Sequence, residues 1–558
     1  GGKRRMKLSG AQAIIKVLLE QGVDTVFGYP GGQVIPLYNA LYDAPLRNVL
    51  TAHEQGAVHA ADGYARASGR TGVCIATSGP GATNIVTGLA TAYLDSVPLV
   101  AITGQVSVAN LGRDSFQEID IVGVTLPITK YNILVRKAED LLPALRQAFY
   151  LAQEGRPGPV LVDVPSDLQV GDVEWTEAEP LVQPARETAR EEILEAAAVT
   201  ITNAKQPVFL VGGGAVHSGA AAEVQYFARK TGIPVVNTLM GIGVFPGSDR
   251  QCLGLTGMHG HIAANMAVAN ADVLIVAGSR FSERVTGDRN RYVGKKTIIQ
   301  LDIDPSEVDK NVMTALPLVG DMKENLTKLS ERVQKLEIEH WWHTIRAWDA
   351  TENRSAQSGD RLTAPWLMKE LTRSFKGEDT VFVTDVGQNQ MWAALHLEVD
   401  APRHHLTSGG CGTMGFGLPA ALGAKISRPE AQVVQICGDG GFKMTGMEMY
   451  TALRESAPFI TVVINNSCLG MVRQWQQVFY DKRYSSTILT PFNFVGFAKA
   501  CGADGATVTT CAEFTAALAK ARKQGKNFLI EAVVEQSDLV EPMVAPGAVL
   551  DDFVKTDA

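Results

Sequence analysis

The feature that most constrains the fold is a pattern that recurs along the chain: a short apolar segment, a glycine-containing turn and a stretch with helical periodicity. Apolar strands that alternate with helices are typical of parallel sheets covered by helices. We therefore predict an α/β protein with three doubly wound parallel-sheet domains, in which residues 73–77, 208–211 and 433–437 form strands.

The strand and linker signals divide the 558 residues into segments. Polar or charged stretches with few strand signals separate the three domains, as is common at domain boundaries. A tail with two prolines follows the last domain and is expected to form an arm. The predicted segments are domain 1–170, linker 171–192, domain 193–335, linker 336–360, domain 361–540 and C-terminal arm 541–558.

Composition excludes several classes of protein. Hydrophobic residues make up 46% of the chain, and the formal net charge is -8. The chain can therefore build large cores and lacks the basic excess of a nucleic-acid binder. No apolar run reaches the roughly 18 residues of a membrane span. The seven cysteines form no C-x-x-C pair, which favours reduced thiols and a cytoplasmic protein with no nucleic-acid or membrane partner.

Two strand ends in the last domain carry the most specific signal. Asp439 follows the apolar segment 433–437, and Asn466 follows the next apolar strand. The carboxyl ends of parallel strands lie at one edge of a sheet, where ligands bind, so these two side chains are expected at the same edge. Carboxylate and amide oxygens suit Mg²⁺, and the glycines around Asp439 would let backbone N–H groups approach a diphosphate. Alone, an Asp-Gly turn is more often an ordinary strand end.

The combination of Gly-Asp-Gly and Asn-Asn resembles the fingerprint of thiamine diphosphate (ThDP) enzymes. The resemblance implies that Asp439, Asn466 and the main-chain oxygen of Cys468 bind the metal. It also implies a catalytic glutamate in the first domain, hydrogen-bonded to N1′ of the cofactor's aminopyrimidine, and Glu54 is the candidate. Without this resemblance, Glu54 would be read as a solvated carboxylate at a helix start.

Further motifs resemble the acetohydroxyacid synthase (acetolactate synthase) family, and this resemblance covers nearly the whole chain. The implied enzyme is a transferase that decarboxylates pyruvate on ThDP. It passes the hydroxyethyl group to a second pyruvate, giving 2-acetolactate, or to 2-ketobutyrate, giving 2-aceto-2-hydroxybutyrate, in branched-chain amino-acid biosynthesis. The motifs begin at Phe27, Val49, Ser115, Gly155, Gly257, Gly412 and Gly470.

The same resemblance implies roles for individual residues. Gln117 would lie near the reacting centre. Met414 would enforce the bent form of the cofactor. The main-chain oxygen of Gly412 would accept a hydrogen bond from the amino nitrogen of the cofactor. Arg284 would bind the carboxylate of the second ketoacid, and Trp475 would pack against its alkyl group. The other expected substrate-binding residues are Phe116, Met258 and Met471.

The first and third domains would then bind the pyrimidine and the diphosphate of ThDP. The expected ThDP-binding residues are Glu54, Val386, Gly387, Gln388, Gly412, Met414, Asp439, Gly440, Gly441, Asn466, Cys468, Gly470 and Met471.

The middle domain carries a weaker signal. A glycine triplet follows the strand 208–211, but its spacing does not match the dinucleotide-binding fingerprint, so the domain could also be a spacer. The resemblance is to FAD-containing synthases, in which this domain binds flavin without a net redox role. The implied FAD-binding residues are Arg156, Gly212, Gly213, Gly214, Thr238, Leu239, Met258, His259, Gly278, Arg280, Asp302, Ile303, Gly320 and Asp321.

The resemblance also implies partners and leaves alternatives. Because Glu54 and Asp439 lie in different domains, the family builds its site across a homodimer interface. A homodimer or homotetramer and a regulatory small subunit are therefore expected. Another ThDP-dependent decarboxylase or carboligase, such as pyruvate oxidase or a flavin-free acetolactate synthase, remains the runner-up. A non-catalytic nucleotide-binding oligomer is disfavoured by the complete acid and metal set.

Four positions depart from the family pattern. Ala52, Ser166, Glu283 and Asn389 stand where the family usually has Arg, Lys, Asp and His. The first two remove positive charges near the expected path of the anionic substrates. The preference between the two acceptors is therefore left open.

Overall fold

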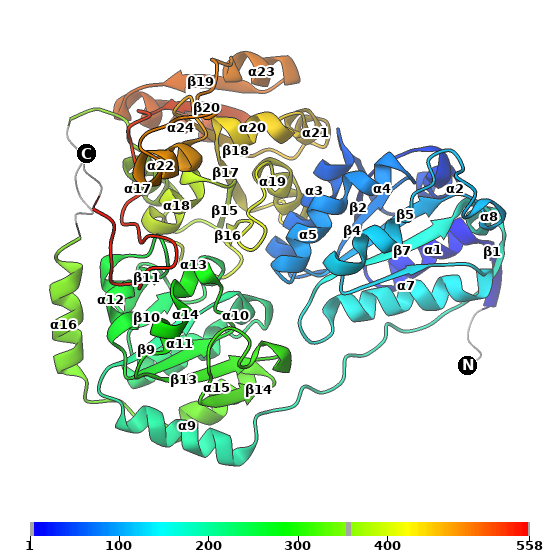
Figure 1. Ribbon diagram of the computed structural model, residues 1–558. Helices are drawn as coiled ribbons and strands as arrows, with labels where there is room; N and C mark the ends of the chain where they lie inside the picture. The colour runs from blue at the N-terminus through cyan, green and yellow to red at the C-terminus, as the bar shows by residue number, and fades with distance from the viewer. Residues whose placement is uncertain (1–4, 353–358, 556–558) are drawn as a thin grey trace.

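The computed structural model describes residues 5–352 and 359–555. In this part of the chain, three six-stranded sheets lie in three separate lobes, with helices packed around each sheet (Figure 1). Every strand pair within these sheets is parallel, which confirms the predicted fold class. No helix across the described ranges combines the length and apolar character needed to cross a membrane.

The first sheet has the strand order β3-β2-β4-β5-β7-β6. A two-stranded antiparallel ribbon of β1 and β8 joins the start of the chain to the end of this domain. The strands are β1 (Arg5–Ser9), β2 (Thr25–Tyr29), β3 (Arg47–Leu50), β4 (Gly72–Ala76), β5 (Leu99–Gln105), β6 (Tyr131–Leu134), β7 (Pro159–Pro165) and β8 (Asp172–Thr176). The helices are α1 (Gly10–Glu20), α2 (Ile35–Tyr42), α3 (Glu54–Ser68), α4 (Pro80–Asn84), α5 (Val86–Leu94), α6 (Ile121–Thr125), α7 (Ala138–Gln153) and α8 (Ser166–Val170).

The second sheet has the order β11-β10-β9-β12-β13-β14. Its strands are β9 (Pro207–Val211), β10 (Val235–Asn237), β11 (Cys252–Leu255), β12 (Val273–Ala277), β13 (Thr297–Asp302) and β14 (Leu316–Val319). The helices are α9 (Glu191–Asn203), α10 (Gly213–His217), α11 (Ala221–Thr231), α12 (Ile262–Asn270), α13 (Glu283–Thr286), α14 (Arg289–Val293), α15 (Met322–Arg332) and α16 (Glu339–Asp349).

The third sheet has the order β16-β15-β17-β18-β20-β19. Its strands are β15 (Thr380–Thr384), β16 (His405–Leu406), β17 (Gln432–Gly438), β18 (Ile460–Asn465), β19 (Asp504–Val508) and β20 (Phe528–Val533). The helices are α17 (Ala364–Ser374), α18 (Gln388–His396), α19 (Gly417–Ser427), α20 (Asp439–Thr445), α21 (Glu448–Arg454), α22 (Gly470–Phe479), α23 (Phe494–Cys501) and α24 (Cys511–Gln524).

Both predicted linkers contain some regular structure. The segment 171–192 contains β8, and residues 177–190 form no helix or strand. The segment 336–360 contains α16, whose Trp341 and Ile345 are buried in the core of the second domain. Residues 353–358 of this segment lie outside the described part. The domain limits themselves stay a prediction.

The first and third domains share one hydrophobic core, because α3 packs directly against α19. The two helices approach so closely that a Cβ atom on Gly63 would lie 2.2 Å from the main-chain oxygen of Ala420. A Cβ atom on Gly423 would lie 1.8 Å from the oxygen of Ala60. Glycine is therefore required at the crossing, and the crossing sets how the two domains are placed.

The predicted C-terminal arm packs on the second and third domains. Val540 and Met543 are buried, and the N–H of Val544 donates to the main-chain oxygen of Met258 at 2.7 Å. The arm therefore borders the region where the second and third domains meet, as the red segment in Figure 1 shows.

Candidate functional site

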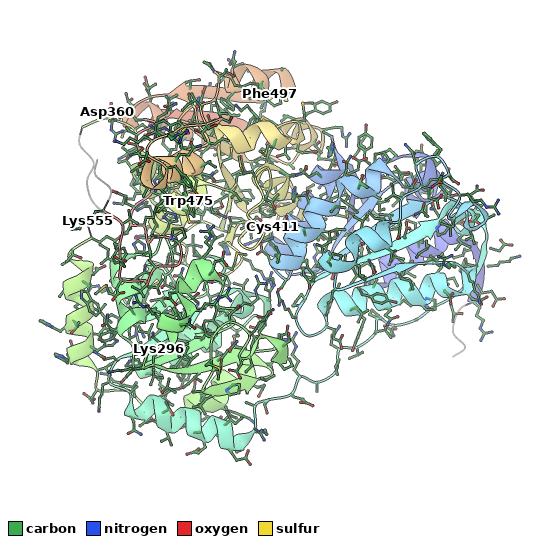
Figure 2. All side chains as sticks on the ribbon, in the orientation of Figure 1. Lys296, Asp360, Cys411, Trp475, Phe497 and Lys555 are labelled. Atoms are coloured by element: carbon green, nitrogen blue, oxygen red, sulfur yellow. The ribbon has the colours of Figure 1, made fainter. Side chains whose placement is uncertain are left out.

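A cavity of about 1110 Å³ opens where the three domains meet. The first domain contributes the end of α5, the second contributes its strand ends, and the third contributes the loops after β15 and β16 together with α22. Cys411 and Trp475, both labelled in Figure 2, belong to this lining. The cavity thus lies at the carboxyl edges of the second and third sheets, the usual place for a ligand in such folds. The first domain closes it with residues that precede β5 and β7.

Nearly all of the predicted FAD-binding residues line this cavity; Gly212 and Asp321 do not. Gly212 instead packs against the backbone of Gly278, since a Cβ atom there would lie 2.4 Å from the oxygen of Gly278. Asp321 caps helix α15 by accepting from the N–H of Glu324 at 3.1 Å. These two residues therefore support the cavity wall and do not face the cavity.

Polar groups on the cavity wall are held by contacts between domains. Arg156 Nη1 donates to Glu307 Oε1 at 2.7 Å, and Arg280 Nη2 donates to the main-chain oxygen of Leu94 at 2.5 Å. Burial raises the pKa of Asp302 to about 6 and lowers the pKa of His259 to about 4. At neutral pH the wall therefore presents a neutral imidazole beside fixed guanidinium groups.

The predicted acceptor-binding residues come together at one side of the cavity. The guanidinium of Arg284 lies 5.3 Å from the ring centre of Trp475, a cation–π arrangement, and its Nη1 lies 3.2 Å from Met258 Sδ. The Arg284 side chain is 57% exposed, and its nearest carboxylate is Glu283 at 3.6 Å. An exposed guanidinium beside aromatic and thioether surface can bind a small carboxylate that carries an alkyl group.

Two glycine-dependent loops of the third domain form the wall next to this pocket. Gly387 has φ +119° and Gly412 has φ +64°, and both positions line the cavity with Val386 and Met471. These φ values favour glycine, because an L side chain would be strained there.

Asp385 fixes both loops and was not found by the sequence analysis. Its buried carboxylate accepts from the N–H of Val386 at 2.8 Å and from the N–H groups of Gly415 and Gly417 at 3.0 Å. Burial raises its pKa, and these N–H groups lower it. An acidic residue directly after the buried strand β15 was the available signal.

The predicted metal residues follow paired strands. Gly438 at the end of β17 is in register with Ile464 in β18, so the turns that carry Asp439 and Asn466 lie side by side. Burial raises the pKa of Asp439 to about 6, while the charge of Lys443 and nearby backbone N–H groups lower it. The Asp439 carboxylate therefore lies near the turn that carries Asn466.

The amide of Asn466 is held in a defined orientation. Its Nδ2 donates to Gln388 Oε1 at 2.9 Å, so its oxygen is left available for a cation. Gln388 in turn donates to Gln474 Oε1 at 3.0 Å. A Cβ atom on Gly470 would lie 2.0 Å from Gln388 Oε1, which explains the glycine at the start of α22.

The rest of the predicted diphosphate set surrounds this edge. Met414 Cε lies 3.4 Å from the position of a Cβ on Gly440, and a Cβ on Gly441 would lie 2.5 Å from Asp385 Oδ1. Cys468 is buried in the turn after Asn466. No cluster of three or more His, Cys, Asp or Glu side chains suited to a metal occurs in the described ranges, but this donor set needs only one carboxylate. The residues fit Mg²⁺ held by oxygen atoms.

The predicted catalytic residues of the first domain form a separate cluster. Glu54 is the first residue of α3, and its Oε2 accepts from Asn84 Nδ2 at 2.9 Å. Gln117 has φ +59° and lies against Gly79. Glu54, Asn84, Phe116 and Gln117 are called the Glu54 cluster below. Phe116 is 84% exposed. None of Glu54, Phe116 and Gln117 is part of the cavity wall that the described residues of this chain form.

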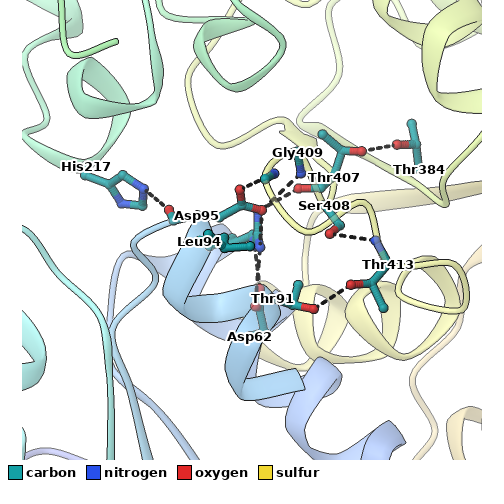
Figure 3. A network of polar contacts seen from close by, with 12 residues as sticks. Asp62, Thr91, Leu94, Asp95, His217, Thr384, Thr407, Ser408, Gly409 and Thr413 are labelled. Atoms are coloured by element: carbon teal, nitrogen blue, oxygen red, sulfur yellow. Dashed lines mark hydrogen bonds and ion pairs between the residues drawn. The ribbon is translucent and has the colours of Figure 1, made fainter. Parts of the chain in front are cut away.

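The end of α5 connects the three domains (Figure 3). The carboxylate of Asp95 accepts from the N–H of Gly410 at 2.7 Å, and its main-chain oxygen lies 3.0 Å from His217 Nε2. The hydroxyl groups of Thr91 and Thr413 lie 2.7 Å apart. The loop that carries Gly412 and Met414 is therefore held by the first domain, a role the sequence analysis did not assign to Asp95.

Comparison with known proteins identifies the class of protein. Thiamine pyrophosphate (TPP) is another name for ThDP. Three family models of thiamine pyrophosphate enzymes match this chain: the N-terminal TPP binding domain at residues 8–124, the central domain at 194–329 and the C-terminal TPP binding domain at 385–532. The chain is therefore a thiamine pyrophosphate enzyme.

Curated relatives narrow this class. The chain is 44% identical to the acetolactate synthase large subunit of Corynebacterium glutamicum, covering 97% of this chain and 89% of the relative. It is also 44% identical to the acetolactate synthase isozyme 2 large subunit of Escherichia coli, covering 97% of this chain and 98% of the relative. The chain therefore belongs to the acetolactate synthase large-subunit family, and the predicted family resemblance is confirmed.

Proposed function

We propose that this chain is the catalytic subunit of an acetolactate synthase, a transferase dependent on ThDP, Mg²⁺ and FAD. The observation that carries the proposal is the Arg284–Trp475–Met258 group, which faces the same cavity as the glycine loops of the ThDP-binding domain. A carboxylate and a short alkyl group fit this group, as the acceptor 2-ketoacids pyruvate and 2-ketobutyrate require.

When bound, ThDP supplies the electron sink that lets pyruvate lose CO₂. The protein's part is to bind, orient and exchange protons. Glu54, held by Asn84, would share a proton with N1′ of the pyrimidine, and Met414 would support the bent cofactor. Asp439 and Asn466, with the Cys468 carbonyl, would hold the Mg²⁺ that anchors the diphosphate.

Arg284 and Trp475 would then orient the second ketoacid. The guanidinium would bind the carboxylate, while the indole would contact the alkyl group and distinguish an ethyl from a methyl. The rest of the cavity fits FAD, because its walls are formed by strand-end glycines and guanidinium groups that suit a diphosphate.

We infer that the working enzyme contains at least two copies of this chain. Support comes from the separation of the Glu54 cluster from the cavity within one chain and from the exposure of Phe116. A second copy would bring its own Glu54, Phe116 and Gln117 to the diphosphate-bound cofactor. The choice between dimer and tetramer stays a prediction.

Two further proposals concern the partner and the location of the protein. The relatives are named large subunits, which supports a separate regulatory small subunit as a partner. A cytoplasmic location is supported by the buried thiols of Cys74, Cys437 and Cys468, which form no disulfide.

A product assay tests the proposed function. The protein is incubated with pyruvate and 2-ketobutyrate in competition, with ThDP, Mg²⁺ and FAD each omitted in turn. We expect 2-acetolactate and 2-aceto-2-hydroxybutyrate, and loss of both when any cofactor is absent. Formation of acetyl phosphate or acetate with consumption of O₂ would instead identify a pyruvate oxidase, and turnover without FAD would identify a flavin-free synthase.

A further inference from the structure

The carboxylate of Glu448 reaches from the third domain into the first. It is the first residue of α21, and it is only 2% exposed. Its two oxygens accept from the N–H of Ala52 at 3.1 and 3.0 Å, and its Oε1 also accepts from the N–H of His53 at 3.1 Å. A buried charged group is thus bonded to two backbone amides of another domain.

These two amides immediately precede Glu54, where α3 begins. N–H groups at a helix start have no partner within the helix and must be satisfied from outside. The N–H of Gln55 donates to His53 Nδ1 at 3.0 Å, and Glu448 accepts from the N–H groups of Ala52 and His53. The residues on which Glu54 depends for its direction are therefore held by a side chain from another domain.

The Glu448 carboxylate packs tightly against the first turn of α3. A Cβ atom on Gly56 would lie 2.0 Å from Glu448 Oε1, so the glycine admits the carboxylate to the helix start. Thr451 donates its hydroxyl to Glu448 Oε2 at 2.7 Å and orients the carboxylate from its own helix. Hydrogen bonds to an ionised acceptor are stronger than neutral ones, and a negative charge at a helix N-terminus adds to this.

We propose that Glu448 is the positioning residue for Glu54: by holding the amides of Ala52 and His53, it sets the direction in which the catalytic carboxylate enters the cofactor site. The catalytic part of this inference rests on the proposed function. Helix α21 closely follows α20, which begins at Asp439, so the segment that carries the metal ligand also places Glu54. If Glu54 serves the cofactor held by a second copy, this segment physically links the two sites.

The test uses Glu448→Ala and Glu448→Gln in the full chain, with Glu455→Gln as the matched control. Glu455 follows the same helix and also contacts the first domain, where Arg47 Nη2 donates to its main-chain oxygen at 2.6 Å. Its carboxylate accepts from Arg47 Nε at 3.4 Å and from Arg454 Nη2 at 3.0 Å. Within the described part of the chain it does not contact Ala52 or His53, so this change should leave the start of α3 as it is.

The first measurement is hydrogen–deuterium exchange of the peptide that covers the start of α3, in the protein without cofactors. We expect exchange at Ala52 and His53 to be at least about tenfold faster in Glu448→Ala, since both amides lose their acceptor. Glu448→Gln retains one acceptor oxygen and is expected to lie between wild type and Glu448→Ala. Glu455→Gln should match wild type at these amides.

The second measurement compares the kcat for CO₂ release from pyruvate with the Kd for ThDP. A displaced Glu54 should lower kcat by about ten- to a hundredfold, because misplacement of a reacting group by an ångström can have that effect. The Kd for ThDP, followed by quenching of tryptophan fluorescence, should change by less than about threefold, because the diphosphate edge is untouched. A general structural defect would instead weaken ThDP binding in proportion.

Unchanged amide exchange in a folded Glu448→Ala protein would overturn the proposal, as would a kcat within twofold of wild type. If Glu448→Ala does not fold, Glu448→Gln and Gly56→Ala carry the same test, since a Cβ at Gly56 displaces the carboxylate. Glu54→Gln is measured in parallel. Full CO₂ release by Glu54→Gln would refute the catalytic assignment of Glu54, whereas the amide exchange would still decide whether Glu448 holds the start of α3.

Discussion

The cofactor edge of the third domain and the Glu54 cluster of the first domain differ in how complete they are within one chain. At the third-domain edge, Asp439, Asn466 and Gln388 are buried, and Asn466 donates its amide to Gln388. In the first domain, Glu54 is partly exposed and Phe116 is almost fully exposed. Folding of one chain therefore preorganises the third-domain half of the proposed site, and the two-copy proposal predicts that the first-domain half completes the site of a second copy.

The largest expected effect comes from the exposed half. Glu54→Gln should lower CO₂ release from pyruvate by about 10²–10⁴-fold, because the proton-sharing carboxylate is lost. The rate is measured with saturating ThDP, and cofactor binding should persist. Glu139→Gln, a change of an exposed carboxylate in α7, is the matched control and should leave the rate unchanged. A wild-type rate for Glu54→Gln would contradict the assignment.

Mixing two inactive variants tests whether the two halves come from different copies. Glu54→Gln and Asp439→Asn proteins are dissociated together and reassociated. In mixed dimers, one of the two sites then has both an intact Glu54 and an intact Asp439, so activity should return to roughly a quarter of wild type. The measurement is the rate of acetolactate formation in the mixture. If both residues of a site came from the same chain, mixing would restore nothing.

Metal affinity tests the preorganised half. Asp439→Asn removes a ligand and should abolish tight Mn²⁺ binding, measured by electron paramagnetic resonance with ThDP present. Gln388→Ala should weaken it by about 10–100-fold, because Asn466 loses the partner that orients its amide. Gln390→Ala, in the same helix but bonded to Thr407 instead, serves as the control. Equal affinity for Gln388→Ala and wild type would show that the amide needs no support.

The acceptor pocket should respond more mildly. Trp475→Ala removes the surface next to Arg284, and we expect the preference for 2-ketobutyrate over pyruvate to fall by about tenfold or more. The ratio of the two products under competition measures this effect. Trp366→Phe, at a half-buried aromatic outside the cavity wall, is the control. An unchanged product ratio for Trp475→Ala would remove the indole from acceptor selection.

The smallest effect on turnover concerns stability in the first domain. Burial raises the pKa of Asp163 from 3.8 to about 7, although Thr103 and Gln105 donate to it. The native state therefore binds a proton more tightly than the unfolded state. The contribution of Asp163 to the free energy of unfolding is fully present below pH 4 and is lost as the pH rises through 7. Asp163→Asn should flatten the dependence of Tm on pH across this range, and an unchanged slope would contradict the pKa.

Much of the third-domain edge could be predicted from the sequence. Asp439 and Asn466 follow apolar strands directly, and parallel strands bring their ends to one edge whatever the rest of the chain does. The glycines at 387 and 412 were likewise predicted and have the positive φ values that their loops need. These features depend on residues close together in the sequence or on one βαβ unit.

The contacts that orient these residues could not be predicted. Asp385, Asp95 and Glu448 are ordinary acidic residues in the sequence, and their partners lie in other loops or other domains. The α3–α19 crossing, with glycine on both helices, places the two domains so that the start of α3 lies within reach of Glu448. A carboxylate bonded to amides almost 400 residues away leaves no local pattern.

By itself, the sequence determined the three parallel sheets and predicted that Asp439 and Asn466 share one sheet edge, because strand patterning and strand ends are local properties of the chain. Glu54 was singled out only by the family resemblance. The tertiary structure decided what surrounds them. It placed Arg284 over Trp475, joined the loop that carries Gly410 and Gly412 to the first and second domains through Asp95, and left Glu54 outside the cavity of its own chain. The physical reason is that packing between domains selects which distant polar groups meet, and buried polar groups must then be satisfied by those partners.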